Sequence, residues 1–168
     1  MTARRLIIKA DGGSRGNPGP AGYGAVVLDA VTGEVLAEVS EAIGHATNNV
    51  AEYSGLVAGL RAAGKLAPGA AAEVRMDSKL VVEQMSGRWK IKHPDLRPLA
   101  AEASRAARAL GRVTYTWVPR ERNTHADRLA NQAMDTISER AKAPGGAARG
   151  FGGGSGGRRP PSGTAGLW

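Results

Sequence analysis

The sequence predicts an α/β fold in which a five-stranded mixed sheet is flanked by helices. Short apolar runs of strand length alternate with longer stretches in which apolar residues recur every three or four positions. The first three strand-like runs follow one another closely, as in an antiparallel meander, whereas helical stretches separate the last two. We therefore expect three antiparallel strands followed by two parallel ones.

The three N-terminal strands are expected at residues 7–11, 22–28 and 35–39. The first ends at Asp11 and is followed at once by turn-forming Gly, Asn and Pro residues. A strand that delivers an acid to a tight loop is typical of a functional site. The simpler explanation is that Asp11 binds the amides of its own turn.

A long helix is expected from Asn49 onward, because apolar residues recur there with helical spacing. Thr47, Asn48 and Asn49 can cap its N-terminus, and Glu52 would lie in the first turn. The remaining elements are expected as strands at 72–76 and 113–118 and as helices at 80–85, 94–110 and 124–137. Asp77 then ends a second strand, and Asp127 lies in the first turn of a helix capped by Thr124.

The chain has 168 residues, a size typical of one domain, and a formal net charge of +8 that favours a polyanionic partner. Residues 141–168 carry four basic side chains and no acidic one, and they are rich in Gly, Pro and Arg. We expect a folded domain over residues 1–140 and a disordered tail or linker over 141–168.

The chain contains no cysteine, which excludes disulfides and cysteine-ligated zinc. Lys9 and Asp11 interrupt the N-terminal apolar run, which is too short for a signal peptide or a membrane span. We expect a cytoplasmic protein with no membrane partner.

Four acids, Asp11, Glu52, Asp77 and Asp127, occupy element ends from which their side chains could converge. Carboxylates that meet repel one another, and a cluster with oxygen ligands only suits Mg²⁺ or Mn²⁺. Each acid also has a simpler explanation: turn bonding for Asp11, capping for Asp77 and helix-dipole interaction for the other two.

Four motifs favour the convergent arrangement. They are Asp11-Gly-Gly-Ser-Arg-Gly-Asn-Pro-Gly-Pro20, Thr47-Asn-Asn-Val-Ala-Glu52, Met76-Asp77-Ser78 and Trp117-Val-Pro-Arg-Glu-Arg-Asn-Thr-His-Ala-Asp127. With these four motifs in this order, the chain resembles type 1 ribonuclease H over residues 4–138. The resemblance implies a ribonuclease H-like fold and an endoribonuclease that hydrolyses the RNA strand of RNA/DNA hybrids, leaving 5′-phosphate and 3′-hydroxyl ends.

By this resemblance the four acids, Asp11, Glu52, Asp77 and Asp127, are the metal-binding residues. The expected cofactor is a pair of Mg²⁺ ions about 3.5 to 4 Å apart, with Mn²⁺ as an alternative. Asp11 would bridge both ions, Glu52 and Asp77 would hold the second, and Asp127 would complete the water-activating site.

The loop before Asp127 is short, whereas many bacterial relatives carry a catalytic histidine on a longer loop there. The chain thus resembles the short-loop, actinobacterial branch of the family, in which an arginine seven residues before the last acid takes over proton transfer. That position is Arg120. His125 is the alternative, although two residues on a helix turn it about 200° away from Asp127.

Recognition of the hybrid needs groups that sense backbone shape and the 2′-hydroxyl. Thr47 would hold a phosphate of the DNA strand. Trp89 would pack on a sugar, in the core or at a helix edge. The residues expected to contact substrate are Gly12, Asn17, Thr47, Asn48, Asn49, Ser78 and Trp89.

Two other functions stay open: a non-catalytic hybrid-binding module, and a nuclease of the same fold that acts on double-stranded RNA or DNA. We expect a monomer. The chain also resembles actinobacterial proteins in which such a domain is fused to a C-terminal phosphatase-like domain, so a longer form is expected to carry one.

Overall fold

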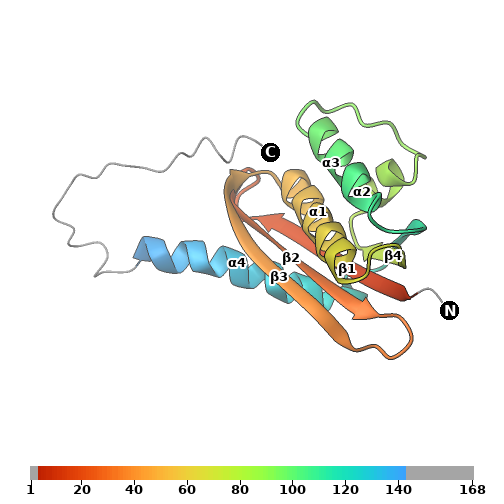
Figure 1. Cartoon of the computed structure of the whole chain (residues 1–168). Helices are drawn as coiled ribbons and strands as arrows, with labels where there is room; N and C mark the ends of the chain where they lie inside the picture. Colours follow the sequence, from red (N-terminus) through yellow and green to blue (C-terminus); the bar gives the residue numbers. More distant parts are fainter. Residues whose placement is uncertain (1–3, 143–168) are drawn as a thin grey trace.

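Five strands form one mixed sheet with the order β3-β2-β1-β4-β5 (Figure 1). This computed structural model describes residues 4–142. The strand β1 pairs antiparallel with β2 and parallel with β4, which confirms the predicted fold class. The strands are β1 (Arg5–Ser14), β2 (Gly19–Asp29), β3 (Val35–Ala46), β4 (Ala71–Met76) and β5 (Val113–Trp117).

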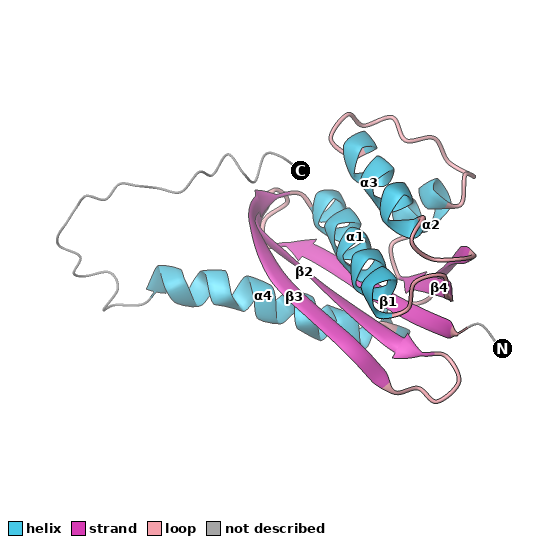
Figure 2. Cartoon of the chain, in the orientation of Figure 1, coloured by secondary structure: helices cyan, strands magenta, loops and turns pink. Residues whose placement is uncertain are grey.

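Helices cover both faces of the sheet (Figure 2). On one face α1 packs against β1 and β2, and α3 packs on α1. On the other face α4 packs against β1, β2 and β3. The helices are α1 (Asn48–Leu66), α2 (Lys79–Met85), α3 (Arg97–Ala107) and α4 (Thr124–Lys142), with a 3₁₀ turn, η1 (Arg120–Arg122), before α4.

The expectation that the first strand ends at Asp11 is wrong. Asp11 pairs with Gly24, and the pairing of β1 with β2 continues to Ser14 opposite Ala21. The glycines after Asp11 are extended strand residues, and the turn begins only at Arg15. Asp11 is therefore an interior strand residue, which excludes the turn-bonding explanation.

The N-terminus of α1 also differs from the prediction. Thr47 is the N-cap and its hydroxyl accepts a hydrogen bond from the Val50 amide (3.2 Å), so Glu52 lies beyond the first turn. Ser78, not Asp77, caps α2. Neither Glu52 nor Asp77 therefore serves a helix N-terminus.

The starts of α3 and α4 differ from the prediction: α3 begins later, and α4 has a different cap. The helix expected from residue 94 begins at Arg97, with Pro98 in its first turn. Asn123 precedes α4, of which Thr124 is the first residue. This helix continues to Lys142, two residues past the domain boundary predicted at residue 140. Residues 143–168 of the predicted tail lie outside the described residues.

The core lies between the sheet and α1. Leu6, Ile8 and Ala10 alternate along β1 and are buried, and Tyr53, Leu56 and Leu60 meet them from the helix. No helix within the described residues is long and apolar enough to cross a bilayer.

Candidate active site

Asp11 and Asp77 belong to neighbouring parallel strands. The register of β1 and β4 pairs Lys9 with Arg75, and each acid follows two residues later on its chain. Because side chains alternate along a strand, both acids lie on the side of the sheet that carries Lys9 and Arg75. The charge of Asp77 contributes to a raised pKa of Asp11, so the structure brings this predicted pair together.

Asp127 reaches the same place from α4. Its carboxyl group hydrogen-bonds with that of Asp11, and Asn131 Nδ2 donates a hydrogen bond to Asp127 Oδ2 (3.3 Å). The helix can approach this closely because Gly24 has no side chain: a Cβ there would lie 2.5 Å from Leu129 Cβ.

Glu52 comes from α1, on the opposite face of the sheet. A Cβ on Gly12 would overlap the backbone of Ala51, so the glycine is what lets α1 lie directly against β1. Ser78 Oγ donates a hydrogen bond to Glu52 Oε1 (2.9 Å) and accepts one from the Val81 amide (3.2 Å). Ser78 therefore fixes the carboxyl group of Glu52 beside Asp77.

The electrostatics of this cluster disfavour ionisation of two acids. Burial raises the pKa of Asp11 to about 8, helped by the charge of Asp77 and by the hydrogen bond and charge of Asp127. Burial also raises the pKa of Glu52 to about 7; the Ser78 hydrogen bond and the charge of Arg120 oppose this rise, and Asp77 adds to it. A cation placed here would relieve both penalties.

The donor set fits a hard cation that takes further ligands from outside the protein. Among residues 4–142, no three carboxyl or imidazole groups form a ready-made site that could hold a metal ion by themselves. The four acids are linked pairwise instead, through Asp11 with Asp77 and Asp127 and through Glu52 with Asp77. Mg²⁺ is usually held by one or two carboxylates, water and substrate phosphate oxygens, and the donors here are oxygen only.

Asn123 is a central residue that is not among the predicted ones. It is 1% exposed, and its Nδ2 donates hydrogen bonds to Asp77 Oδ1 (3.0 Å) and to the Ala10 carbonyl (2.9 Å). The backbone carbonyl of Asn123 accepts a hydrogen bond from the Asp127 amide (3.1 Å). Asn123 thus connects β1, β4 and α4, and an Asn just before a helix is the sequence signal that could have indicated it.

The structure separates the two candidates for proton transfer. Arg120 Nε lies 3.8 Å from Asp77 Oδ2, and the Arg120 side chain is 82% exposed. His125 Nε2 lies 2.6 Å from Glu38 Oε2 of β3. Arg120 is therefore next to the acid cluster, whereas His125 is engaged with the edge strand.

Two predicted substrate residues, Asn17 and Asn48, are hydrogen-bonded to each other at the end of β1. Asn48 Oδ1 accepts a hydrogen bond from the Ser14 amide (2.7 Å), and Asn17 Oδ1 accepts one from the Asn48 amide (3.0 Å). Thr47 adjoins them as the cap of α1. Asn49 is exposed beside this group.

The other predicted contacts are more dispersed. Ser78 is 7% exposed, and its hydroxyl is used within the protein. Gly12 is explained by packing against α1. Trp89 is 46% exposed, so the core alternative for this residue is wrong. The substrate contacts of all three stay predictions.

Known proteins resemble this chain in sequence and in fold. The reverse transcriptase-like family model matches residues 9–133. A ribonuclease H from Hydrogenovibrio crunogenus is 33% identical, and the match covers 80% of this chain and 99% of that protein. The chain belongs to the type 1 ribonuclease H family. Its five-stranded sheet and flanking helices are accordingly a ribonuclease H fold.

Solved structures of the family support the same assignment. The N-terminal RNase H domain of Rv2228c from Mycobacterium tuberculosis is 62% identical with a TM-score of 0.79, covering 83% of this chain and 99% of that one. LC11-RNase H1 in complex with an RNA/DNA hybrid is 41% identical with a TM-score of 0.75, covering 79% and 99%. The chain spans 38% of the length of the mycobacterial relative named bifunctional protein Rv2228c, to which it is 64% identical over 139 residues.

Proposed function

We propose that the chain is a metal-dependent endoribonuclease that hydrolyses the RNA strand of RNA/DNA hybrids, leaving 5′-phosphate and 3′-hydroxyl ends. The observation that carries the proposal is the linkage of four acids from β1, α1, the end of β4 and α4, two of them with raised pKa values. The hybrid complex of the relative LC11-RNase H1 supports the choice of substrate. The name of the longer relative supports a second activity in a longer form of the protein.

Asp11, Glu52, Asp77 and Asp127 are the residues that would hold the metal, with two Mg²⁺ ions expected. Bound Mg²⁺ supplies positive charge that activates water and neutralises charge on the phosphate. Asp11 interacts with both Asp77 and Asp127, which supports its role as the shared ligand. Ser78 orients Glu52, and Asn123 orients Asp77.

Arg120 is the side chain best placed to act on the phosphate from the protein side. It is exposed and lies beside Asp77, so it can move toward a bound strand. A guanidinium keeps its proton at neutral pH, so Arg120 would donate hydrogen bonds to charged phosphate oxygens and would not accept a proton.

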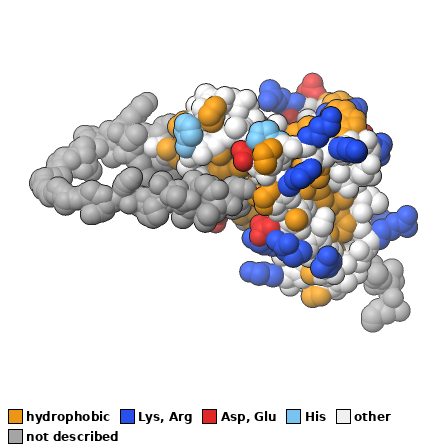
Figure 3. Space-filling model, turned by 90° about the horizontal axis from the view of Figure 1, so that it is seen from above, with side chains coloured by type: hydrophobic (Ala, Val, Ile, Leu, Met, Phe, Trp, Pro, Cys, Tyr) orange, Lys and Arg blue, Asp and Glu red, His pale blue; other side chains and the backbone are white. Residues whose placement is uncertain are grey.

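Recognition of the hybrid would come from the amides and hydroxyl at the end of β1. Asn17 holds the Asn48 amide, Thr47 caps α1 next to it, and Asn49 is exposed beside them. Amides and hydroxyls of this kind can bind the phosphate backbone and the 2′-hydroxyl. Lys and Arg side chains gather on the face of the molecule seen in Figure 3, which favours a polyanion.

The test is cleavage of a labelled RNA/DNA hybrid in Mg²⁺ or Mn²⁺, with double-stranded RNA and DNA of the same sequence as competitors. We expect the RNA strand alone to be cut, Asp77→Asn to abolish cutting, and the exposed Asp95→Asn control to retain it. Metal-independent binding without cleavage would favour the non-catalytic module. Equal cleavage of plain DNA would refute the proposed specificity.

A further inference from the structure

Part of the sheet is covered by no helix of residues 4–142. On the α4 side, the helix packs against β1, β2 and β3 and leaves β4 and β5 without comparable packing. We call the α4-side surface of β1, β4 and β5 the open sheet face. Its side chains come from alternate strand positions, beginning at Arg5 in β1, at Ala71 in β4 and at Arg112 just before β5.

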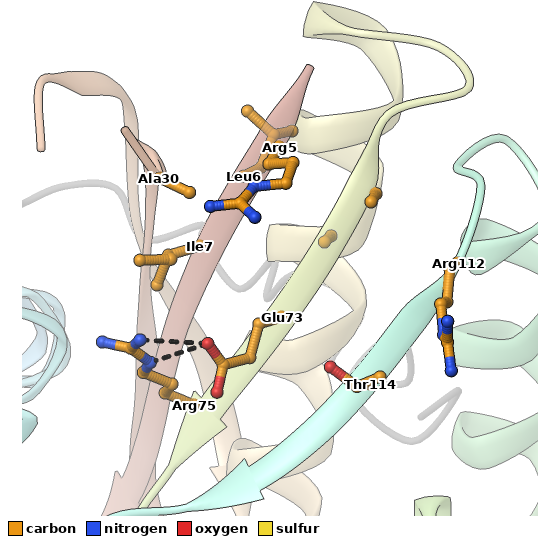
Figure 4. A pocket seen from close by; sticks show the side chains of 10 residues that line it. Arg5, Leu6, Ile7, Ala30, Glu73, Arg75, Arg112 and Thr114 are labelled. Carbon is orange, nitrogen blue, oxygen red and sulfur yellow. Dashed lines mark hydrogen bonds and ion pairs between the residues drawn. The ribbon is translucent and has the colours of Figure 1, made fainter. Parts of the chain in front are cut away.

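A cavity of about 270 Å³ lies at the N-terminal end of the open sheet face (Figure 4). Arg5 and Arg112 flank it from the two sides, and the ion pair of Arg75 with Glu73 (3.0 Å) closes one end. Glu73 also accepts a hydrogen bond from Thr116 Oγ1 (2.8 Å), so its charge is already engaged.

The cations of this face lack acidic partners. Within the part of the chain that the structure describes, Arg5, Lys9 and Arg112 make no ion pair with a carboxylate. Ordinary surface arginines such as Arg61 and Arg88 do have such partners in this protein. Uncompensated charge on β1 and at the start of β5 is what an anionic ligand would neutralise.

A second hollow extends the open sheet face toward the candidate active site. It has a volume of about 630 Å³ and shares Glu73 and Arg75 with the first cavity. Trp117 contributes to its wall, but it alternates with Thr114 and Thr116 along β5, so its side chain turns to the α2 side of the sheet, where Lys79 Nζ lies 5.6 Å from the centre of its ring. The two hollows therefore lead from Arg5, past the ion pair of Glu73 with Arg75, to the η1 loop that precedes Asp127.

The dimensions and chemistry of the face favour a single strand over a duplex. Six residues of β1 separate Arg5 from Asp11, a path of about 20 Å. A basic groove that follows the nucleic-acid backbone is typical of proteins that bind single strands without sequence preference. Thr114 and Thr116 add hydroxyl groups between the arginines.

We propose that the open sheet face binds the phosphate backbone of single-stranded nucleic acid that extends from a hybrid held in the candidate active site. This proposal rests on the proposed function, because the acid cluster defines where the strand begins. It assigns Arg5, Lys9 and Arg112 to phosphate contacts.

The test measures binding in chelator, so that no cleavage occurs. The full chain is titrated with a blunt hybrid and with four hybrids that carry a ten-nucleotide overhang, 5′ or 3′, on the DNA or the RNA strand. We expect at least one overhang to tighten binding. Arg5→Gln/Arg112→Gln should abolish this gain, reduce the slope of log affinity against log salt by about 1.4, and weaken overhang binding roughly 25-fold at 0.1 M salt.

The matched control is Lys65→Gln/Arg108→Gln, which removes the same charge from exposed positions at the C-terminal ends of α1 and α3. It should keep the gain from the overhang. The proposal is overturned if no overhang tightens binding, or if the gain survives loss of Arg5 and Arg112. It is also overturned if a polyglutamate peptide alone binds in an arginine-dependent way, which would assign the face to an acidic protein segment.

Cleavage of the blunt hybrid by the unchanged chain is measured separately in Mg²⁺. Overhang-dependent binding without cleavage would refute the proposed function and leave the nucleic-acid site in place. Cleavage without any effect of an overhang would refute the single-strand site and leave the proposed function in place.

Discussion

Replacing Asp11 by Asn should stabilise the metal-free protein while it abolishes activity. The pKa of Asp11 rises from 3.8 to about 8, so the folded state holds the proton more tightly than the unfolded state does. Well below pH 3.8 both states are protonated and the acid costs nothing. As the pH rises toward 8, only the folded state resists ionisation, and Asp11 increasingly destabilises the fold.

The size of the effect follows from the pKa values. One pKa unit corresponds to about 1.4 kcal/mol, so the cost of Asp11 is below about 1 kcal/mol at pH 4 and about 1.5 kcal/mol at pH 5. It reaches the order of 5 kcal/mol at pH 8. An Asn at this position stays neutral and avoids that cost, so the gain in stability should grow steadily with pH.

Urea unfolding in chelator at pH 5 and pH 8 measures the free energy of unfolding directly. The exposed Asp95→Asn variant is the control and should not change the stability at either pH. Adding Mg²⁺ should stabilise the unchanged chain and not Asp11→Asn, because the ion offsets the cost of ionising this buried carboxyl group beside Asp77 and Asp127. A pH-independent gain, or a less stable variant at pH 8, would refute the electrostatic account of the cluster.

Three further outcomes follow from single contacts. Gly12→Ala should lower the free energy of unfolding by about 3 kcal/mol or more in the same urea assay, because the added methyl group meets the backbone of α1. The control is Gly13→Ala, whose methyl group meets the flexible side chain of Met134 and should cost far less. Asn123→Ala removes the hydrogen bonds to Ala10 and Asp77 and should lower the free energy of unfolding by about 1 to 3 kcal/mol. Because Asp77 loses its orienting partner, kcat should fall more than KM rises. An unchanged kcat would exclude a positioning role for Asn123. Arg120→Ala should lower kcat on the hybrid about 100-fold and His125→Ala by less than about twofold, and the reverse order would return the role to His125.

Much of the fold and the acid cluster could be predicted because strand and helix periodicities are strong and the motifs lie in order. The ends of elements could not. The glycines after Asp11 have the composition of a turn, yet their lack of side chains is what allows β1 to continue beneath α1. Asn123 has the composition of a helix cap, but its side chain turns inward to Asp77. In both cases a tertiary contact decided between two local conformations that the sequence allowed equally.

Close backbone packing explains why acids from opposite faces of a sheet can meet at all. A sheet separates the helices on its two faces, so Glu52 of α1 and Asp127 of α4 would ordinarily lie too far apart to share a site. Gly12 allows α1 to lie against β1 on one face, and Gly24, opposite Asp11 in the ladder, allows α4 to do the same on β2. Both helices come close to the sheet beside the pair of Asp11 with Gly24, because Gly12 follows Asp11 directly and Gly24 lies opposite it. The backbone therefore assembles the carboxyl groups before any cation binds, and the raised pKa values of Asp11 and Glu52 record the electrostatic cost of that preorganisation.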